Sequence, residues 1–409
     1  MGRMGNKVVF VWGALPGELV EVEITKDKKS FAEGIVTEII ESSPERIAPR
    51  EDHYLSCSPW QIMSLKAEEE WKKKIVAEVY QKFADVNLGD VDFANSSHEY
   101  SYRNKIEFGF CEGENDKVQL SVYERDSHEK VAITECLLAR EPLNKVAVRI
   151  LDWINKSNLH LEELNSLVVR CNQANQVVAG LFLSNKVEIG VGPEMDKTFI
   201  GFAVYLGTLK NDFSGGRKIF QLGNGYLKEN ILKTELEFGL LSFMQINVAT
   251  FELALLDIKK WLKRDDKVID YYCGAGAISI PLSNNFASAQ LVEINAEAAD
   301  LAVKNIAKNK IKNCEVFGRD AERAIEFISA GSTIILDPPR AGVGNMVISA
   351  ILKNLPKKII YLSCDTTTQA RDIKKLLGEY TLEFVKIYNF FPRTPHIETL
   401  AVLVKRVKH

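Results

Sequence analysis

The stretch Val268-Ile-Asp-Tyr-Tyr-Cys-Gly-Ala-Gly-Ala-Ile278 decides the fold, because an apolar run ends in a glycine-rich turn and a helical pattern follows. Two later segments have the same form, Thr333-Ile-Ile-Leu-Asp-Pro-Pro-Arg340 and Lys358-Ile-Ile-Tyr-Leu-Ser-Cys-Asp365. Continuous apolar runs that alternate with helices predict parallel strands buried on both faces. Ligands of such sheets bind at the carboxyl ends of the strands, so we expect a site where these segments end.

The alternation of strands and helices begins near residue 241 and continues to the end of the chain. We expect a Rossmann-like, doubly wound parallel sheet with an antiparallel tail. The predicted strands are residues 267–271, 289–293, 314–317, 333–336 and 358–362, followed by the two tail strands 382–391 and 397–404.

The preceding residues predict two further domains. Short β-branched runs at 8–11, 19–24 and 31–40, separated by Gly/Pro turns, are typical of a small β-barrel. Strand-like runs with interspersed helices then indicate an α+β central domain. The predicted division is 1–48 for the β-barrel, 49–240 for the central domain and 241–409 for the parallel-sheet domain.

Composition indicates a soluble globular protein that works in the cytoplasm as a monomer. Fifty-two basic residues against 55 acidic ones leave a net charge of −3, so global charge does not indicate nucleic-acid binding. Basic runs such as Lys72-Lys-Lys74 are interpreted as solvated helix faces. No apolar run approaches the roughly 20 residues of a membrane helix, and the N-terminus lacks an apolar signal core. Seven scattered cysteines fit a reducing compartment.

The glycine turn indicates a cofactor that carries a nucleoside. Gly274 and Gly276 allow a ligand to approach the backbone, and Glu293 follows Gly274 by 19 positions, where a carboxylate can accept hydrogen bonds from ribose hydroxyls. Asp320, just past the third strand, could meet an adenine amine. Ser279 stands where a dinucleotide fingerprint requires its third glycine. S-adenosylmethionine therefore fits better than a nicotinamide cofactor.

Cys364 is the candidate nucleophile, because a thiol at a strand end can add to carbon 6 of a pyrimidine and make carbon 5 nucleophilic. The residues from Thr366 to Thr368 predict a helix N-cap that favours the thiolate. A base must then remove the carbon-5 proton; Glu398 and His396 are both candidates, and their spacing leaves the choice open. The remaining cysteines are interpreted as small buried hydrophobes: Cys57, Cys111, Cys136, Cys171, Cys273 and Cys314.

Six stretches together resemble the RNA uracil-C5 methyltransferase family, in particular its TRAM-bearing 23S rRNA type. They are Phe243-Met-Gln-Ile-Asn247, Asp270-Tyr-Tyr-Cys-Gly-Ala-Gly276, Val292-Glu293, Leu336-Asp-Pro-Pro-Arg-Ala-Gly342, Ser363-Cys364 and His396-Ile-Glu-Thr399. The run Val8-Val-Phe-Val-Trp-Gly-Ala-Leu-Pro-Gly-Glu18 resembles a TRAM domain, and Tyr102-Arg-Asn-Lys105 resembles an RNA-contacting motif.

The resemblance implies a role for each matching residue. Cys364 becomes the nucleophile, and the resemblance selects Glu398 as the base. The implied S-adenosylmethionine site comprises Gln245, Tyr272, Gly274, Gly276, Glu293, Asp320 and Asp337, and the implied RNA-binding residues are Arg103, Lys105 and Arg340.

The implied substrate is a uridine in RNA, with 23S rRNA favoured and uridine 54 of tRNA as the alternative. A cytosine-C5 enzyme would carry a cysteine after Asp337-Pro-Pro, where this chain has none. An inactive RNA-binding protein is the alternative of another class, and the presence of both Cys364 and Glu398 opposes it.

Two departures from the family pattern stand out. Many relatives hold a [4Fe–4S] cluster through four cysteines, whose positions correspond here to Glu51, Cys57, Trp60 and Cys136. With two ligands replaced, we expect no such cluster and no metal. Asp365 stands where relatives carry asparagine, and its charge predicts a higher pKa for the neighbouring Cys364 thiol.

Overall fold

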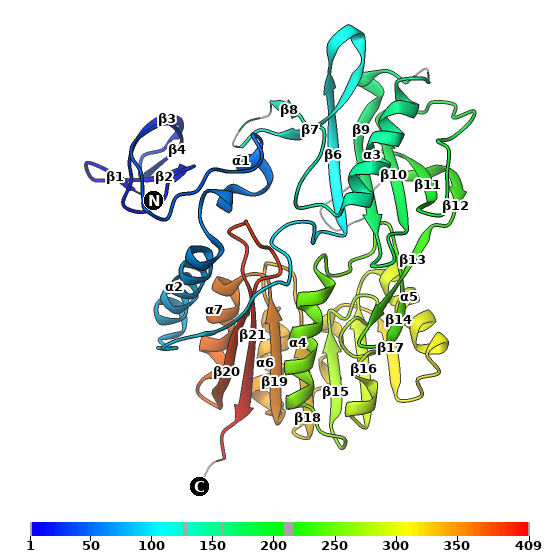
Figure 1. Cartoon of the computed structure of the whole chain (residues 1–409). Helices are drawn as coiled ribbons and strands as arrows, with labels where there is room; N and C mark the ends of the chain where they lie inside the picture. The colour runs from blue at the N-terminus through cyan, green and yellow to red at the C-terminus, as the bar shows by residue number, and fades with distance from the viewer. Residues whose placement is uncertain (1, 126, 128, 158, 208–215, 408–409) are drawn as a thin grey trace.

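A computed structural model describes residues 2–125, 127, 129–157, 159–207 and 216–407 (Figure 1). The first strands form a four-stranded sheet in the order β1-β2-β4-β3, in which β2 and β4 run parallel. The structure adds one short strand to the three that the sequence predicts. These strands are β1 (Gly2–Met4), β2 (Lys7–Trp12), β3 (Leu19–Asp27) and β4 (Phe31–Glu41).

The middle of the chain forms a seven-stranded sheet in the order β12-β11-β10-β9-β6-β7-β8. Helix α3 (Glu141–Ile154) covers it, and its buried leucine, valine and isoleucine side chains join the apolar core of this sheet. The strands are β6 (Lys105–Glu112), β7 (Val118–Tyr123), β8 (Lys130–Ala132), β9 (Leu164–Cys171), β10 (Val177–Leu183), β11 (Phe199–Leu206) and β12 (Arg217–Gly223). The hairpin of β13 (Tyr226–Ile231) and β14 (Thr234–Gly239) follows.

The third sheet has the predicted doubly wound form, in the order β17-β16-β15-β18-β19-β21-β20-β5. The first five strands are parallel, and β21 is antiparallel to both of its neighbours, as the sequence predicts for the tail. These strands are β15 (Lys267–Tyr271), β16 (Ser288–Glu293), β17 (Cys314–Gly318), β18 (Ser332–Leu336), β19 (Lys358–Ser363), β20 (Tyr380–Tyr388), β21 (Glu398–Lys405) and β5 (Asp92–Ala94).

The helices that flank this sheet are α4 (Val248–Trp261), α5 (Ala296–Lys308), α6 (Asn345–Asn354) and α7 (Thr366–Leu376). After the Gly274 turn, residues 274–282 form successive turns rather than the regular helix that the sequence predicts. Ile278, Ile280 and Leu282 are nevertheless buried there against the sheet. No helix in the described ranges is long and apolar enough to cross a bilayer.

Helix α2 (Leu65–Ala84) and strand β5 lie in the predicted central domain by sequence but pack with the C-terminal sheet. Tyr80 of α2 donates a hydrogen bond to Gln369 of α7 at 2.7 Å, and β5 pairs in parallel with β20. Figure 1 shows α2 beside α7. The N-terminal sheet and the central sheet lie beyond one end of the C-terminal sheet. The predicted boundaries at residues 48 and 240 stay predictions, but α2 contributes to the C-terminal core.

Candidate active site

The pairing of β19 with β21 brings Cys364 and Glu398 to the same end of the sheet. In this antiparallel register Leu362 lies opposite Leu400, and Ser363 lies opposite Thr399. The next pair outward is therefore Cys364 and Glu398, although 34 positions (398 − 364) separate them along the chain. The two residues that the sequence selects as nucleophile and base thus sit across from each other at one strand end.

Both groups lie in surroundings that disfavour charge. Burial, followed by the carboxyl groups of Glu398 and Asp337, raises the pKa of the half-buried Cys364 thiol to about 11, and Arg340 opposes this shift. Glu398 is only 2% exposed, and burial together with Asp337 raises its pKa well above the ordinary value. Its Oε1 atom is buried without a hydrogen-bond partner. An unsatisfied carboxyl oxygen beside a thiol is costly for stability and suits a proton acceptor.

Asp365 caps a helix directly after Cys364. Its carboxylate accepts a hydrogen bond from the Thr368 backbone N–H at 2.8 Å, which makes Asp365 the N-cap of α7. The groups that shift the Cys364 pKa most are burial, Glu398, Asp337 and Arg340. The expectation of an N-cap within residues 366–368 is therefore corrected to Asp365, whereas an effect of the Asp365 charge on the thiol stays a prediction.

The turn after β15 has a backbone that a ligand can approach closely. Tyr272, Gly274 and Gly276 all have positive φ angles, of 64°, 56° and 85°. A methyl group at Gly276 would clash with Ile280, whereas one at Gly274 would meet nothing within 4 Å. The Gly274 N–H donates to Glu293 Oε2 at 2.9 Å, and Asn295 N–H donates to the other oxygen at 2.7 Å. Glu293 is thus fixed beside open space and keeps lone pairs for a ligand.

Acidic groups line the neighbouring strand ends. Burial and the Asp270 carboxyl raise the pKa of Asp337, which also accepts a hydrogen bond from Gln245. Asp320, after β17, accepts from the Glu322 N–H at 2.7 Å. The register places all of these residues at the carboxyl ends of β15–β18. Oxygen acceptors around an open glycine turn fit ribose hydroxyls and a cationic group, as the predicted cofactor requires.

Sequence reasoning missed Asp270 and Ser279 as members of this cluster. Asp270 is fully buried and accepts a hydrogen bond from Ser279 Oγ at 2.5 Å; burial raises its pKa to about 7. Ser279, at the position of a missing fingerprint glycine, therefore pairs with one oxygen of a buried acid that in turn raises the pKa of Asp337, while Asp270 Oδ1 is buried without a hydrogen-bond partner. An aspartate inside an apolar strand was the available signal.

His396 lies beside Arg340 at this end of the sheet. Its Nδ1 lies 3.3 Å from Nη2 of Arg340. Burial, followed by Arg340 and Arg103, lowers the pKa of His396 to about 4, so the ring is neutral and weakly basic near pH 7. The predicted RNA-binding residue Arg340 is exposed at this edge of the site.

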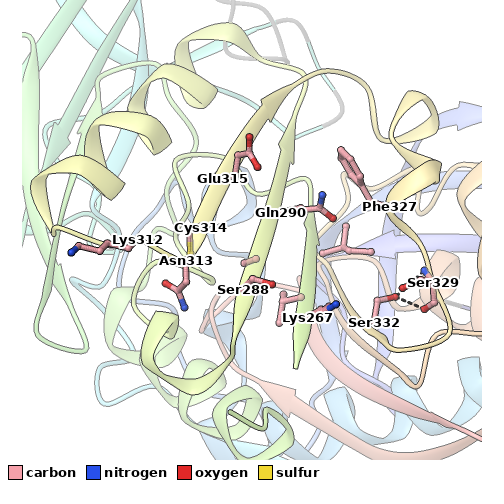
Figure 2. A pocket seen from close by; sticks show the side chains of 13 residues that line it. Lys267, Ser288, Gln290, Lys312, Asn313, Cys314, Glu315, Phe327, Ser329 and Ser332 are labelled. Carbon is pink, nitrogen blue, oxygen red and sulfur yellow. Dashed lines mark hydrogen bonds between the residues drawn. The ribbon is translucent and has the colours of Figure 1, made fainter. Parts of the chain in front are cut away.

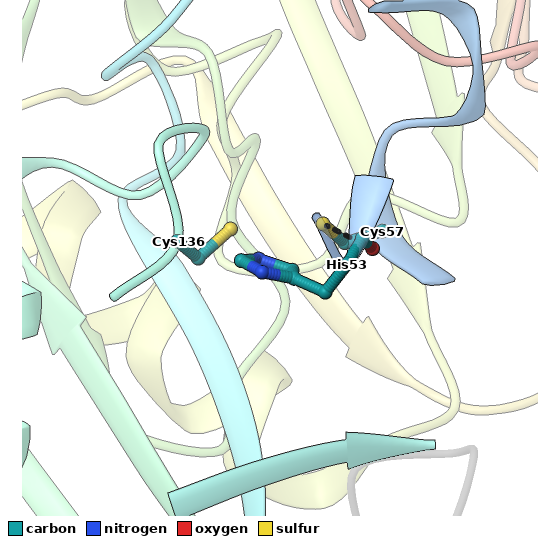
Figure 3. Close-up of side chains that lie close together, drawn as sticks. All are labelled: His53, Cys57 and Cys136. Atoms are coloured by element: carbon teal, nitrogen blue, oxygen red, sulfur yellow. Dashed lines mark hydrogen bonds between the residues drawn. The ribbon is translucent and has the colours of Figure 1, made fainter. Parts of the chain in front are cut away.

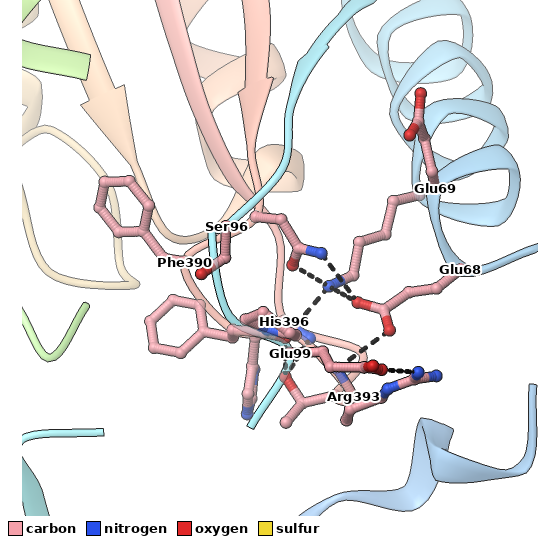
Figure 4. Close-up of polar contacts among 12 residues, drawn as sticks. Glu68, Glu69, Ser96, Glu99, Phe390, Arg393 and His396 are labelled. Atoms are coloured by element: carbon pink, nitrogen blue, oxygen red, sulfur yellow. Dashed lines mark hydrogen bonds and ion pairs between the residues drawn. The ribbon is translucent and has the colours of Figure 1, made fainter. Parts of the chain in front are cut away.

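A buried polar network holds the loop 389–397, which precedes Glu398 (Figure 4). Lys72 and Glu68 of α2 are both fully buried, and Lys72 Nζ donates to Glu68 Oε1 at 2.8 Å, Asn389 Oδ1 at 2.8 Å and the Phe391 carbonyl at 3.1 Å. Glu68 also accepts from the Arg393 N–H at 3.0 Å. The interpretation of Lys72 as part of a solvated face is wrong, because the loop desolvates it.

The Tyr102-Arg-Asn-Lys105 motif joins the central domain to this loop and to the cofactor side. Tyr102 Oη donates to the Pro392 carbonyl at 3.0 Å, and Asn104 Nδ2 donates to the Gln245 carbonyl at 2.9 Å. Arg103 and Lys105 are half-buried, and burial lowers the pKa of Lys105 to about 7. Their predicted contacts with RNA stay predictions.

A cavity of about 420 Å³ lies at the opposite end of the sheet (Figure 2). Its lining includes Lys267, Ser288, Cys314 and Ser332, the first residues of four parallel strands. Because Cys364 follows the carboxyl end of β19, this cavity is not the candidate active site.

Comparisons with known proteins agree with this geometry. A family model described as tRNA (Uracil-5-)-methyltransferase matches residues 238–407, and a TRAM domain model matches residues 1–37. An uncharacterized RNA methyltransferase of Clostridium acetobutylicum is 30% identical, with 100% of this chain and 94% of the relative covered. A similar protein of Bacillus cereus is 27% identical, with 99% and 94% covered.

A solved structure shares the fold over almost the whole chain. It is the Pyrococcus abyssi tRNA (uracil-54, C5)-methyltransferase in complex with S-adenosyl-L-homocysteine, with a TM-score of 0.77 and 23% identity. The superposition covers 97% of this chain and 96% of the archaeal protein. The chain therefore shares the overall fold of that structure.

Proposed function

We propose that this chain, which belongs to the S-adenosylmethionine-dependent RNA (uracil-5-)-methyltransferase family, methylates carbon 5 of a uridine through a covalent bond between Cys364 and carbon 6. The observation that carries this proposal is the β19–β21 register, which sets the unpartnered carboxyl of Glu398 across from the Cys364 thiol. A nucleophile and a base at one strand end are what this chemistry requires.

The proposed steps balance in atoms and charge. The Cys364 thiolate adds to carbon 6, and the electron pair of the 5,6 double bond makes carbon 5 nucleophilic. S-adenosylmethionine, when bound, would supply the methyl group as an electrophile, and S-adenosylhomocysteine would be the leaving group, because the cofactor sulfur keeps the electron pair of the broken bond. The Glu398 carboxylate then takes the carbon-5 proton, the double bond re-forms and the bond between sulfur and carbon 6 breaks. The uridine has exchanged a proton for a methyl group, and Cys364 leaves as the thiolate it was at the start.

The residues of the open turn would hold the cofactor. Glu293 and Asp320 offer acceptors to a nucleoside, and the backbone at Gly274 leaves room beside them. Asp337 and Gln245 would face the charged end of the molecule, where a carboxyl with a raised pKa favours a cation. Tyr272 and Gly276 complete the turn.

The pKa shifts support Glu398 as the base. A carboxyl whose pKa is raised by burial is a stronger base than an exposed one once it has ionised. His396, with its pKa lowered to about 4 and Arg340 beside it, is a weaker base near neutral pH.

Trapping of an RNA adduct tests the mechanism. We expect wild-type protein to form a covalent complex with RNA that contains 5-fluorouridine, because fluorine blocks the final proton loss. Cys364→Ala should form no adduct and no product, while Cys111→Ala, which alters a half-buried cysteine elsewhere, should do both normally. Glu398→Gln should accumulate adduct on normal RNA. Full turnover by Cys364→Ala would refute the proposed nucleophile, and normal turnover by Glu398→Gln would refute the proposed base.

We propose 23S rRNA as the substrate, on the resemblance to TRAM-bearing relatives. A tRNA uridine is the second candidate, because both the matched family model and the archaeal structure are named for tRNA. Methyl transfer to purified tRNA and to 23S rRNA, with mapping of the 5-methyluridine, separates the two. Product on neither RNA would favour the inactive RNA-binding alternative. We further propose a monomer that acts in the cytoplasm, which sedimentation and cell fractionation would test.

A further inference from the structure

Among the residues that the structure describes, one group outside the active site has the composition of a metal site: His53, Cys57 and Cys136 (Figure 3). A ring nitrogen of His53 and the two Sγ atoms all lie within 4.8 Å of one another. His53 precedes and Cys57 ends the short helix α1 (Tyr54–Cys57), while Cys136 comes from the loop between β8 and α3. Figure 3 shows the three side chains pointing toward one another.

A buried carboxylate lies beside the histidine at ion-pair distance. Glu51 is 8% exposed, and its Oε1 lies 3.2 Å from His53 Nε2. The same carboxylate accepts from the Leu137 N–H at 2.6 Å and from Gln61 Nε2 at 2.6 Å, so its position is fixed. Histidines that bind metals usually donate their second ring N–H to such a carboxylate. Glu51 therefore belongs to the surroundings that a metal-bound His53 would need.

We propose that His53, Cys57 and Cys136 bind one Zn²⁺ ion, with Glu51 holding the imidazole in orientation. Two thiolates and one imidazole are ligands that zinc prefers, and a fourth position stays open for water or an outside ligand. The ion would displace the thiol protons, and its two positive charges would balance the two thiolates.

This site differs from the four-cysteine cluster of many relatives, for which Glu51 and Trp60 replace two ligands. The loss of those cysteines excludes a Cys₄ cluster. His53, which corresponds to none of the four positions, completes a smaller set with the two cysteines that remain. The prediction of no metal considered only the four cluster positions, and His53 is not one of them.

The proposed ion would help to fix the position of the backbone segment that carries Arg103. The Cys136 backbone N–H donates to Asn144 Oδ1 at 3.2 Å, and Asn144 Nδ2 donates to the Cys136 carbonyl at 3.1 Å. The next carbonyls, of Leu137 and Leu138, accept from the N–H groups of Ser101 and Arg103 at 2.8 and 2.9 Å. Zinc would thus join α1 to the backbone beside the predicted RNA-binding motif.

Metal titration of the full chain tests the proposal. Chelator-treated, reduced wild-type protein should take up one Zn²⁺ per chain, and Co²⁺ in its place should give the thiolate charge-transfer absorption of a tetrahedral site. Cys57→Ser and Cys136→Ser should weaken Zn²⁺ binding at least a hundredfold, and Glu51→Gln about 10- to 100-fold. Cys111→Ser should bind as the wild type does.

Three results would overturn the proposal: no Zn²⁺ retained by the wild type against a chelator, unchanged affinity in both serine variants, or about four irons per chain after anaerobic purification. If the serine variants do not fold, the melting temperature decides. Zn²⁺ should raise it for the wild type and not for His53→Gln, and no rise for the wild type would equally reject the site. Because none of these readouts is methyl transfer, they leave the proposed function untouched.

Discussion

Replacing Lys72 with methionine should destabilise the protein by about 3–5 kcal/mol, the usual cost of removing one partner from a buried ion pair. Lys72 is 0% exposed, and its ammonium group makes three hydrogen bonds, to Glu68, Asn389 and the Phe391 carbonyl. Methionine would fill much of the space but would leave the Glu68 carboxylate buried without its cation. Burial lowers the pKa of Lys72, so this place disfavours an unpaired charge.

A double-mutant cycle isolates this pair. Glu68→Gln with Lys72→Met removes both charges, so the double variant should be more stable than the sum of the single losses predicts, by about 2 kcal/mol or more. The adjacent pair Lys73–Glu69 on the same helix is the matched control, because its side chains are 27% and 29% exposed. Lys73→Met should cost less than about 1 kcal/mol.

Urea unfolding, followed by fluorescence and by amide exchange of the loop 389–397, measures these differences. Methyl transfer should fall in Lys72→Met, because this loop leads directly into Glu398, and should be unaffected in Lys73→Met. A stability loss in Lys72→Met no larger than that in Lys73→Met would show that solvent reaches the network and that the reasoning is wrong.

Three further predictions concern the active site. The pKa of Cys364 is raised from about 9 to about 11, so its thiolate fraction at neutral pH is about a hundredfold below that of an ordinary cysteine. Alkylation of Cys364 in the free protein should therefore become about tenfold faster with each pH unit. An alkylation midpoint below pH 9 would contradict this prediction. Gly276→Ala should cost about 1–3 kcal/mol of stability, because of its positive φ and the clash with Ile280. Gly274→Ala should cost less stability and mainly weaken S-adenosylhomocysteine binding, which calorimetry would measure. Equal stability losses in the two variants would argue against the clash. Asp365→Ala should lose about 1 kcal/mol of stability, because it removes the α7 cap. Asp365→Asn should keep the cap and lower the alkylation midpoint of Cys364, because it removes a neighbouring negative charge; an unchanged midpoint would refute that charge effect.

The parallel sheet and its site could be predicted because buried strands are continuous apolar runs, and the residue after each run must lie at one edge. The burial of Lys72 could not be predicted in this way. An i,i+4 pair such as Glu68 and Lys72 has the same spacing whether water or protein covers it, and the covering residues Asn389 and Phe391 lie more than 300 positions away. The position of His53 beside two cysteines likewise depends on a loop contact that no local pattern encodes.

The raised pKa values at the strand ends have a common cause that bears on ligand choice. Asp270 raises the pKa of Asp337, and Asp337 raises those of Glu398 and Cys364, so four proton-bearing groups disfavour one another's ionised forms. A cationic ligand beside Asp337 reverses this balance, because it favours the charged form of every member at once. By linkage, the same cation binds more tightly as these groups ionise. A site with these four groups therefore favours a cationic ligand, and a larger fraction of its thiol and carboxyl groups is ionised when that ligand is bound.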